Sequence, residues 1–170
     1  MSKTKTVGRE YFSITIGSPT PSLGRIETNI DRDPNDRKRQ ATLALGGTRG
    51  RRAASNYEVK EVLANGGAAV VSWKLETGRT HQIRVHSKHI GYPLLGDETY
   101  GGTASAAANT IAKGRPAKQS SIRDLVTQLG RPALHARTLE FEHPLTKERL
   151  TFSCEVPSDL MDTVTRLKEF

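Results

Sequence analysis

Apolar and polar residues alternate in several short runs along the chain. In residues 10–17, Phe12, Ile14 and Ile16 alternate with tyrosine, serine and threonine side chains. A period of two residues is typical of a β-strand that buries one face. The strands predicted in this way are residues 10–17, 25–30, 53–63, 68–75, 133–142 and 149–156.

Two of these runs should form a hairpin. Residues 53–63 and 68–75 are separated by Asn65-Gly66-Gly67, and Asn and Gly tolerate the positive φ angles of a tight turn. A further turn is expected at residues 143–145, between the last two strands. Residues 42–45 form only a short apolar piece.

Helical signals are fewer. Thr80 is a suitable N-cap for a helix over residues 81–89, which a glycine and a proline follow. Serine residues can cap two further helices, over residues 121–129 and 158–170. The apolar face predicted for the last helix consists of Leu160, Met161, Val164 and Leu167.

Residues 103–121 contain few large apolar side chains and many Ala, Ser, Gly and Lys residues. We expect them to form an exposed, partly disordered insertion. The remaining elements predict one α+β domain over residues 1–170. It should contain a mixed, mainly antiparallel sheet with a few flanking helices.

Composition adds a strong charge bias. The formal net charge is +8, and only 35% of the 170 residues are hydrophobic. Such a balance favours anionic partners, chiefly nucleic acid or an acidic membrane surface, although ordinary surface lysine and arginine would also produce it. No apolar run is long enough for a transmembrane helix, and no secretory signal is present. Cys154 is the only cysteine, which excludes an intrachain disulfide and suits an intracellular location, in the cytoplasm or an organelle.

Residues 76–86 combine a glycine turn with two arginines and two histidines. Arg79 should lie at the mouth of the helix, while His81, Arg84 and Lys88 share one helical face and Ile83 shares the other with a histidine. A helix N-terminus adds unpaired N–H groups and partial positive charge. The sequence therefore predicts a site for phosphate or carboxylate, with a solvated surface helix as the alternative.

Other chemistry fits this segment poorly. His81 and His86 lie five residues apart, on different helical faces, and no third metal ligand stands nearby, so no metal site is expected. Neither histidine has a serine or cysteine partner with the signature of a hydrolytic nucleophile.

A second basic region surrounds residues 42–45. If its members lie on one side of a ribbon, they form a patch that follows a phosphate backbone; the alternative is a flexible, solvated loop. The glycines of residues 46–50 have neither the P-loop nor the dinucleotide-binding spacing. The members are Arg37, Lys38, Arg39, Arg49, Arg51 and Arg52.

The run LETGRTHQIRVHSKHIGYPLLGDETYGG, residues 75–102, resembles the C-terminal signature of the RluA-type pseudouridine synthases. The flanking sequences agree. REYFSITIG resembles the family segment that carries an active-site tyrosine, and RPALHARTLEFEHPLTKERLTF resembles the family's last strands. The resemblance covers nearly the whole chain.

The resemblance implies isomerisation of uridine to pseudouridine in ribosomal or transfer RNA, without a cofactor, a metal or a membrane partner. The target nucleotide would be flipped out of the helix. Arg84 matches the arginine that pairs with the catalytic aspartate, and Tyr11 matches the tyrosine that stacks on the target base. Ile83 and Leu95 fall in the motif that lines the family's pocket.

One part of the family pattern is missing. The aspartate of the family lies in a His-Arg-Leu-Asp segment upstream of the tyrosine strand, and these residues contain no such segment. Asp31, Asp33, Asp36 and Asp97 do not match its context. We therefore expect either the C-terminal portion of a synthase catalytic domain, inactive by itself, or an RNA-binding paralogue without catalysis. We also expect an unpaired sheet edge at Tyr11, and therefore a chain that is marginally stable or self-associating.

Overall fold

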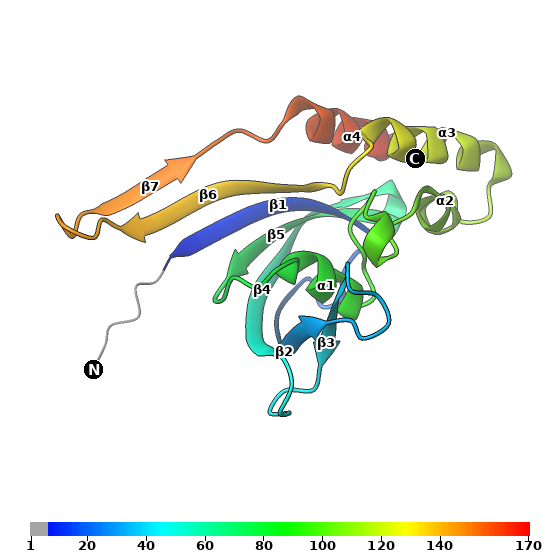
Figure 1. Cartoon of the computed structure of the whole chain (residues 1–170). Coiled ribbons are helices and arrows are strands. Elements are labelled where there is room, and N and C mark those ends of the chain that lie inside the picture. The colour runs from blue at the N-terminus through cyan, green and yellow to red at the C-terminus, as the bar shows by residue number, and fades with distance from the viewer. Residues whose placement is uncertain (1–6) are drawn as a thin grey trace.

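The computed structural model describes residues 7–170, and Figure 1 shows a twisted sheet with one group of helices at its end and a separate helix against its face. The sheet has seven strands in the order β3-β2-β4-β5-β1-β6-β7, and all neighbours are antiparallel. The α+β prediction with a mainly antiparallel sheet is confirmed. The strands are β1 (Gly8–Ile16), β2 (Leu23–Arg32), β3 (Gln40–Leu43), β4 (Arg51–Leu63), β5 (Ala68–Leu75), β6 (Leu134–Glu142) and β7 (Arg149–Ser153).

The predicted central hairpin is confirmed as β4–β5. A single 3-10 turn, Ala64–Gly66, connects the two strands, with Asn65 and Gly66 at φ angles of 51° and 86°. Both residue types tolerate this left-handed region, whereas Ala64 of the same turn adopts it, at a φ of 48°, against the preference of alanine.

The expected edge at Tyr11 is wrong. β1 pairs with β5 on one side and with β6 on the other, so Tyr11 lies inside the sheet. The edge strands are β3 and β7. The prediction of a free edge failed because sequence order does not reveal that β6, more than 100 residues later, pairs with β1.

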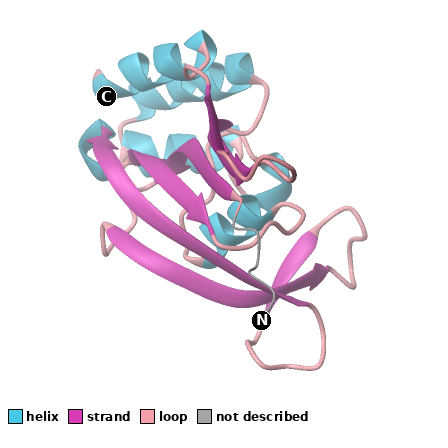
Figure 2. Ribbon diagram, turned by 90° about the vertical axis from the view of Figure 1, so that its left-hand side faces the viewer, coloured by secondary structure: helices cyan, strands magenta, loops and turns pink. Residues whose placement is uncertain are grey.

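The predicted insertion at residues 103–121 is also wrong. These residues form α2 (Ala104–Ala112) and the start of α3 (Pro116–Leu129), which runs beside α4 (Ser158–Lys168) at one end of the sheet (Figure 2). Ala107, Ala108 and Ile111 are fully buried in the largest hydrophobic cluster. Small alanine side chains allow close packing here, whereas their low hydrophobicity suggested exposure.

Helix ends differ from the capping predictions. α1 (Gln82–His89) begins after His81, which adopts a left-handed conformation, and Thr80 is not its N-cap. α3 starts at Pro116 rather than at a serine, and Pro157 occupies the N-cap position of α4. On α4, three of the four predicted core residues are buried, while Met161 is 45% exposed.

α1 packs on the face of the sheet formed by β3 and β4. A hydrophobic cluster beneath it contains Trp73, Tyr57, Ile83 and Leu94, and Tyr11 packs against its border. This cluster fixes the height of α1 above the sheet, and therefore the position of the polar residues on its outer side. Within residues 7–170, no helix is long and apolar enough to cross a membrane.

Candidate active site

Gln82 attaches α1 to the sheet. Its side-chain nitrogen donates to the Ala54 carbonyl and to the Ser55 hydroxyl, at 3.0 and 2.9 Å. Its side-chain oxygen accepts hydrogen bonds from the Thr77 hydroxyl and the Arg79 amide. Gln82 is 2% exposed, so these bonds replace those that water would make. They hold the loop before α1, which the sequence analysis interpreted only as a glycine turn.

Arg84 has a carboxylate partner within the chain. Its Nε and Nη2 atoms donate to the two oxygens of Asp97, both at 2.7 Å. Asp97 is fully buried, whereas the Arg84 side chain is 18% exposed. A bidentate pair of this kind fixes the guanidinium plane. The sequence analysis did not anticipate this pair, because Asp97 does not match the context of the family's catalytic aspartate.

The loop that carries Asp97 depends on glycine. Gly96 has a φ of 77°, and Gly102 leaves no room for a side chain, because a Cβ atom there would lie 1.7 Å from the Leu94 carbonyl oxygen. The Gly102 amide also donates to the Asp97 carbonyl. These contacts return the chain sharply on itself and direct Asp97 towards α1.

Tyr100 lies at the centre of the site and is 1% exposed. The guanidinium carbons of Arg84 and Arg39 lie 4.8 and 5.9 Å from the centre of its ring, within the range of cation–π attraction. Its hydroxyl accepts from the Gln40 amide at 2.8 Å and lies 2.9 Å from Nδ1 of His81. One buried ring thus connects α1 to the basic turn before β3. The sequence analysis did not select Tyr100, because its role depends on residues distant in sequence.

Burial and charge change the protonation of the site. Burial, with a smaller effect from the Arg84 cation, lowers the pKa of His81, which favours a neutral imidazole. The hydrogen bonds to Asp97 raise the pKa of Arg84. Burial raises the pKa of Tyr100, so its hydroxyl keeps its proton. Besides Arg39, the site therefore presents the paired Arg84 cation, a histidine in which the neutral form is favoured, and a neutral phenol.

His86 faces the sheet instead of the site. Its ring nitrogens lie 2.9 and 3.1 Å from the hydroxyls of Ser55 and Thr28, and it is fully buried. Burial lowers its pKa to about 4. The predicted division of the helix into a core face and an outer face is confirmed, with Lys88 exposed on the outer face.

Ile83 and Leu95 are 4% and 0% exposed and lie in hydrophobic clusters. The Leu95 amide donates to the Ile14 carbonyl, and its own carbonyl accepts from the Ala133 amide. Both residues therefore support the site from within the core. Their contact with a nucleotide stays a prediction.

Tyr11 and Arg84 approach the segment before and within β6 from two sides. Arg84 lines a cavity of about 360 Å³ together with Arg131 and Pro132. Tyr11 pairs with Ala136 across β1–β6 and lines a separate cavity of about 380 Å³ with residues of β6 and β7. The structure thus places the two residues near one segment, in different cavities.

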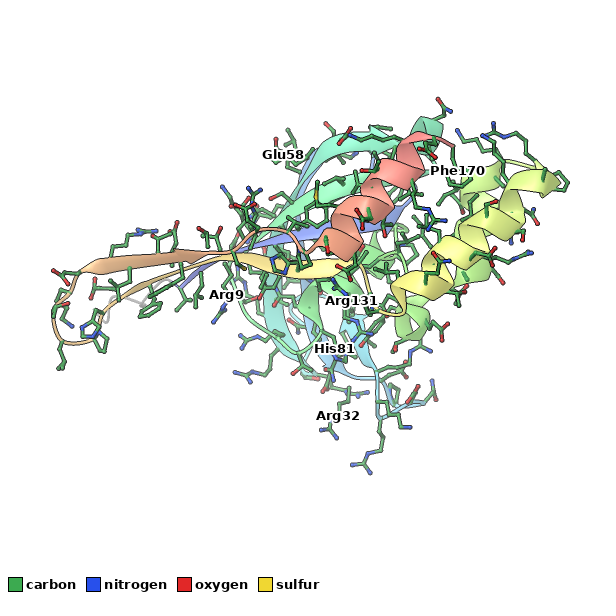
Figure 3. All side chains as sticks on the ribbon, turned by 90° about the horizontal axis from the view of Figure 1, so that it is seen from above. Arg9, Arg32, Glu58, His81, Arg131 and Phe170 are labelled. Atoms are coloured by element: carbon green, nitrogen blue, oxygen red, sulfur yellow. The ribbon has the colours of Figure 1, made fainter. Side chains whose placement is uncertain are left out.

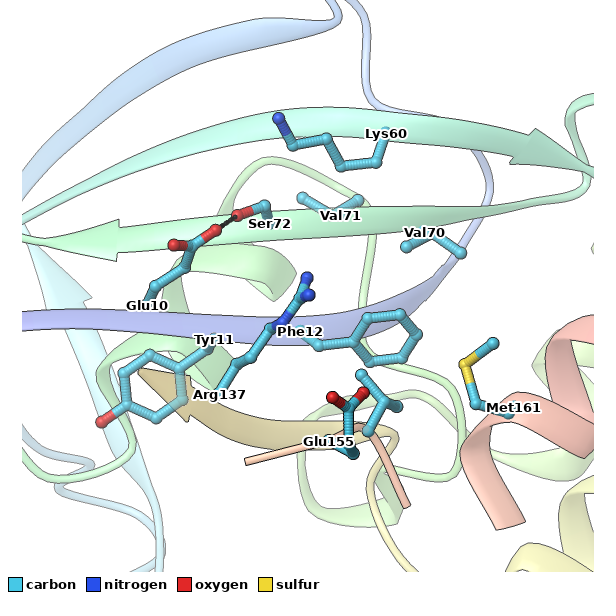
Figure 4. Close-up of a pocket in the computed structure, with 11 residues that line it drawn as sticks. Glu10, Tyr11, Phe12, Lys60, Val70, Val71, Ser72, Arg137, Glu155 and Met161 are labelled. Carbon is cyan, nitrogen blue, oxygen red and sulfur yellow. Dashed lines mark hydrogen bonds between the residues drawn. The ribbon is translucent and has the colours of Figure 1, made fainter. Parts of the chain in front are cut away.

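Tyr11 also lines a further cavity of about 380 Å³, which Figure 4 shows. Glu10 points across it towards Ser72 and accepts a hydrogen bond from that hydroxyl at 2.9 Å. Arg137 and Glu155 complete its polar lining. This cavity contains none of the residues around Tyr100.

The second basic region does not form one patch. Arg51 and Arg52 are adjacent in β4, so their side chains leave opposite faces of the sheet. Arg52 forms ion pairs with Glu27 and Glu76, which leaves little charge for a phosphate. Arg39 stacks near Tyr100, and its buried Nε atom has no hydrogen-bond partner within residues 7–170. Arg37, Lys38, Arg49 and Arg51 are exposed, and Arg49 lies 3.8 Å from an Asp31 oxygen.

Arg79 lies at the mouth of α1, as predicted. Its Nε atom donates to the Arg52 carbonyl at 2.9 Å, so its side chain crosses towards β4 at the loop before α1. Among the described residues, no group of three or more His, Cys, Asp or Glu side chains could hold a metal ion.

The chain matches known proteins along its whole length. Residues 1–89 match the family model for RNA pseudouridylate synthase. The chain is 47% identical to the chloroplastic RNA pseudouridine synthase 2 of Oryza sativa subsp. japonica and 50% identical to that of Arabidopsis thaliana, over 98% of its own length in each case. It is 38% identical to the ribosomal large subunit pseudouridine synthase D of Vibrio cholerae, over 97% of its length.

The matched part is 38%, 39% and 46% of those three proteins, so the chain spans less than half the length of each. The fold is similar to that of human RNA pseudouridylate synthase domain containing 1 and 4, each with a TM-score of 0.64. These two structures are 24% and 23% identical to the chain, cover 88% and 95% of it, and support the fold alone. Together with the motif around Arg84, the family match shows that this chain belongs to the RluA-type RNA pseudouridine synthases.

Proposed function

We propose that this chain supplies the arginine and tyrosine side of an RNA pseudouridine synthase active site. Its substrate would be uridine in structured ribosomal or transfer RNA, and the reaction would need no cofactor. The catalytic carboxylate would come from a polypeptide segment outside residues 1–170. The observation that supports this proposal is the burial of Asp97 in a bidentate ion pair with Arg84.

Asp97 is poorly suited to act as the nucleophile. It is fully buried, and both of its oxygens accept hydrogen bonds from Arg84. A nucleophile must reach the ribose or the base of a flipped nucleotide. A buried carboxylate whose two oxygens both accept hydrogen bonds cannot do this. Asp31, Asp33 and Asp36 lie in or beside the turn after β2, where they accept hydrogen bonds from nearby backbone amides.

Arg84 can instead hold a second carboxylate. Asp97 occupies Nε and Nη2, and within residues 7–170 the Nη1 atom has no hydrogen-bond partner. A guanidinium fixed in this way is preorganised, because its orientation costs no further entropy when the second acid arrives. Tyr11, at the neighbouring cavity, would stack on the uracil. Exposed Arg37, Lys38 and Arg51 would contact the RNA backbone.

A second function is supported by those exposed cations. If no carboxylate joins Arg84, the chain would bind RNA without isomerising it. Salt-dependent RNA binding would then be its whole activity.

A chimera separates the two functions. In the Arabidopsis relative, this chain would replace the segment that it matches, and pseudouridine formation would be measured on ribosomal and transfer RNA transcripts. We expect turnover by the chimera and none by the 170-residue chain alone. Arg84→Met should reduce turnover by at least about 100-fold, because a charge-stabilising group is lost. Arg123→Met, which removes an exposed arginine of α3, is the matched control.

Turnover by the 170-residue chain alone would contradict the need for an outside carboxylate. A chimera that binds RNA normally but forms no pseudouridine would favour the RNA-binding function.

A further inference from the structure

His81, which is labelled in Figure 3, directly precedes α1 and has a left-handed backbone, with φ and ψ of 56° and 21°. A residue with a Cβ atom adopts this conformation at a cost in free energy that glycine does not incur. Within residues 7–170, the His81 side chain makes a single hydrogen bond, between Nδ1 and the Tyr100 hydroxyl. A side chain that is kept at a disfavoured backbone position beside the site suggests a functional role for that side chain.

The Tyr100 hydroxyl determines which nitrogen of His81 carries the proton. Tyr100 is 1% exposed, and its hydroxyl has two hydrogen-bonding neighbours within residues 7–170, the Gln40 amide at 2.8 Å and His81 Nδ1 at 2.9 Å. The amide can only donate, so Nδ1 is the acceptor for the phenol proton. A buried hydroxyl that left its proton unpaired would lose the hydrogen bond that water offers. The neutral His81 ring, which burial favours by lowering its pKa, therefore carries its own proton on Nε2.

The Nε2–H group of His81 is free to donate. It has no acceptor within residues 7–170, and it is not buried, because Arg39 Nε is the one buried and unpartnered side-chain atom of this part of the chain. The His81 ring meets the Tyr100 ring edge-on, with 5.7 Å between the ring centres. Arg84 and Arg39 contact the same Tyr100 ring. With Asp97, this group contains two cations and one carboxylate, so positive charge remains beside the free Nε2–H.

A phosphate oxygen of RNA matches this combination. It accepts hydrogen bonds and carries the negative charge that the remaining cation attracts. A uracil oxygen or a ribose hydroxyl could also accept from Nε2–H, but it would leave the Arg39 charge uncompensated. The Tyr100 hydroxyl also binds the Gln40 amide, so the basic turn that ends at Arg39 lies beside His81.

We propose that His81 binds a phosphate of the RNA strand through Nε2–H, and that Tyr100 is the positioning residue that fixes the orientation and the tautomer of the His81 ring. Arg39 supplies charge to this phosphate subsite. The inference rests on the proposed function and names the RNA group that this part of the site takes. A phosphate held at the start of α1 would place the RNA strand beside Arg84, on the same helix.

Nitrogen NMR of the 170-residue chain tests the proton assignment and the ligand. The His81 ring should show an unprotonated Nδ1 and a protonated Nε2, with its signals identified as those that His81→Asn removes. Saturating oligouridylate should shift the Nε2 signal. The shift should persist with an oligodeoxyuridylate, which lacks the 2′-hydroxyls, and with an abasic oligomer, which lacks the bases. A proton on Nδ1 would overturn the proposal, and loss of the shift with either analogue would assign the acceptor to the ribose or the base.

Oligouridylate binding, followed by fluorescence anisotropy, tests the side chains. His81→Asn tolerates the left-handed backbone and keeps an acceptor for Tyr100, but it lacks Nε2–H. The dissociation constant should therefore rise about tenfold, as expected for a lost hydrogen bond to a charged group. Tyr100→Phe should raise it about fivefold. The matched controls are His89→Asn, an exposed histidine of the same helix, and Tyr57→Phe, a buried phenol bonded to the Pro21 carbonyl, and each should change binding less than twofold.

The double variant distinguishes a positioning role of Tyr100 from a purely structural one. In the His81→Asn background, Tyr100→Phe should weaken binding by less than about twofold, because both changes remove one interaction. Independent, multiplicative effects would overturn the positioning role, and equal effects of His81→Asn and His89→Asn would overturn the phosphate contact. A chimera that forms no pseudouridine would contradict the proposed function and leave the phosphate subsite standing, since NMR and binding measure that subsite without turnover.

Discussion

The site around Asp97 and the β6–β7 hairpin differ in how completely the chain itself pairs their polar groups and covers their apolar side chains. At Asp97, a buried charge has a bidentate partner, and the Tyr100 hydroxyl beside it is hydrogen-bonded. On the hairpin, two large apolar side chains remain about half exposed. In the first region the buried Asp97 charge is paired within the chain, whereas the hairpin is joined to the rest of the sheet through the pairing of β6 with β1. The comparison indicates that these residues fix the Arg84 side chain by themselves, whereas no described residue covers the apolar side chains of the hairpin.

The largest effect is expected at Asp97. Asp97→Asn leaves the Arg84 cation without its counter-charge beside a buried neutral amide, so the free energy of unfolding should fall by about 3–5 kcal/mol. Urea denaturation followed by circular dichroism measures this. The control is Asp159→Asn, which removes the exposed pair with Arg131 and should cost less than about 1 kcal/mol. Similar losses for both variants would mean that the Asp97 pair is no more important than a surface pair.

A smaller effect concerns His86 and pH. Its pKa is about 4 in the folded chain because of burial, against about 6.5 when unfolded. Between these values the unfolded chain binds a proton that the folded chain does not, so stability is lost as the pH falls from 6.5 to 4. The loss should reach about 3 kcal/mol by pH 4. Because carboxylates also titrate there, the quantity to measure is the difference between the wild type and His86→Gln. Parallel stability curves for the two proteins would refute the assignment.

The smallest effect is expected on the hairpin. Phe152→Thr removes an aromatic ring that is 56% exposed, and the free energy of unfolding should change by less than about 0.5 kcal/mol. Thermal denaturation of the 170-residue chain alone is sufficient to test this. A loss of several kcal/mol would show that the ring already has a cover within the chain, and would remove the contrast with Asp97.

Local patterns predicted the strands well. Alternation identified both strands of the central hairpin and the residues around Tyr11, because the period of two persists wherever one face of a sheet is buried. Helix ends were predicted less well. Thr80 has the right chemistry for an N-cap, but His81 occupies that position in a left-handed conformation, without a capping hydrogen bond from its side chain.

Residues 103–121 show a different limit of structure prediction from sequence. Their alanines suggested exposure, yet Ala107 and Ala108 are fully buried between helices and sheet. Hydrophobicity measures the tendency of a side chain to leave water, whereas burial here depends on how closely two backbones can approach.

The sequence by itself determined the family motif, the strands and the choice of Arg84 and Tyr11. Each of these depends on residue types at short spacing. Only the tertiary structure decided that Arg84 is paired with Asp97, that Tyr100 connects Arg39 to His81, and that β1 is covered by β6. These features join residues from 13 to more than 100 positions apart, so local spacing carries no record of them. Leu139, Phe141, Leu150 and Phe152 are seen to share one face only once β6 and β7 are in register, because register decides which side chains lie together.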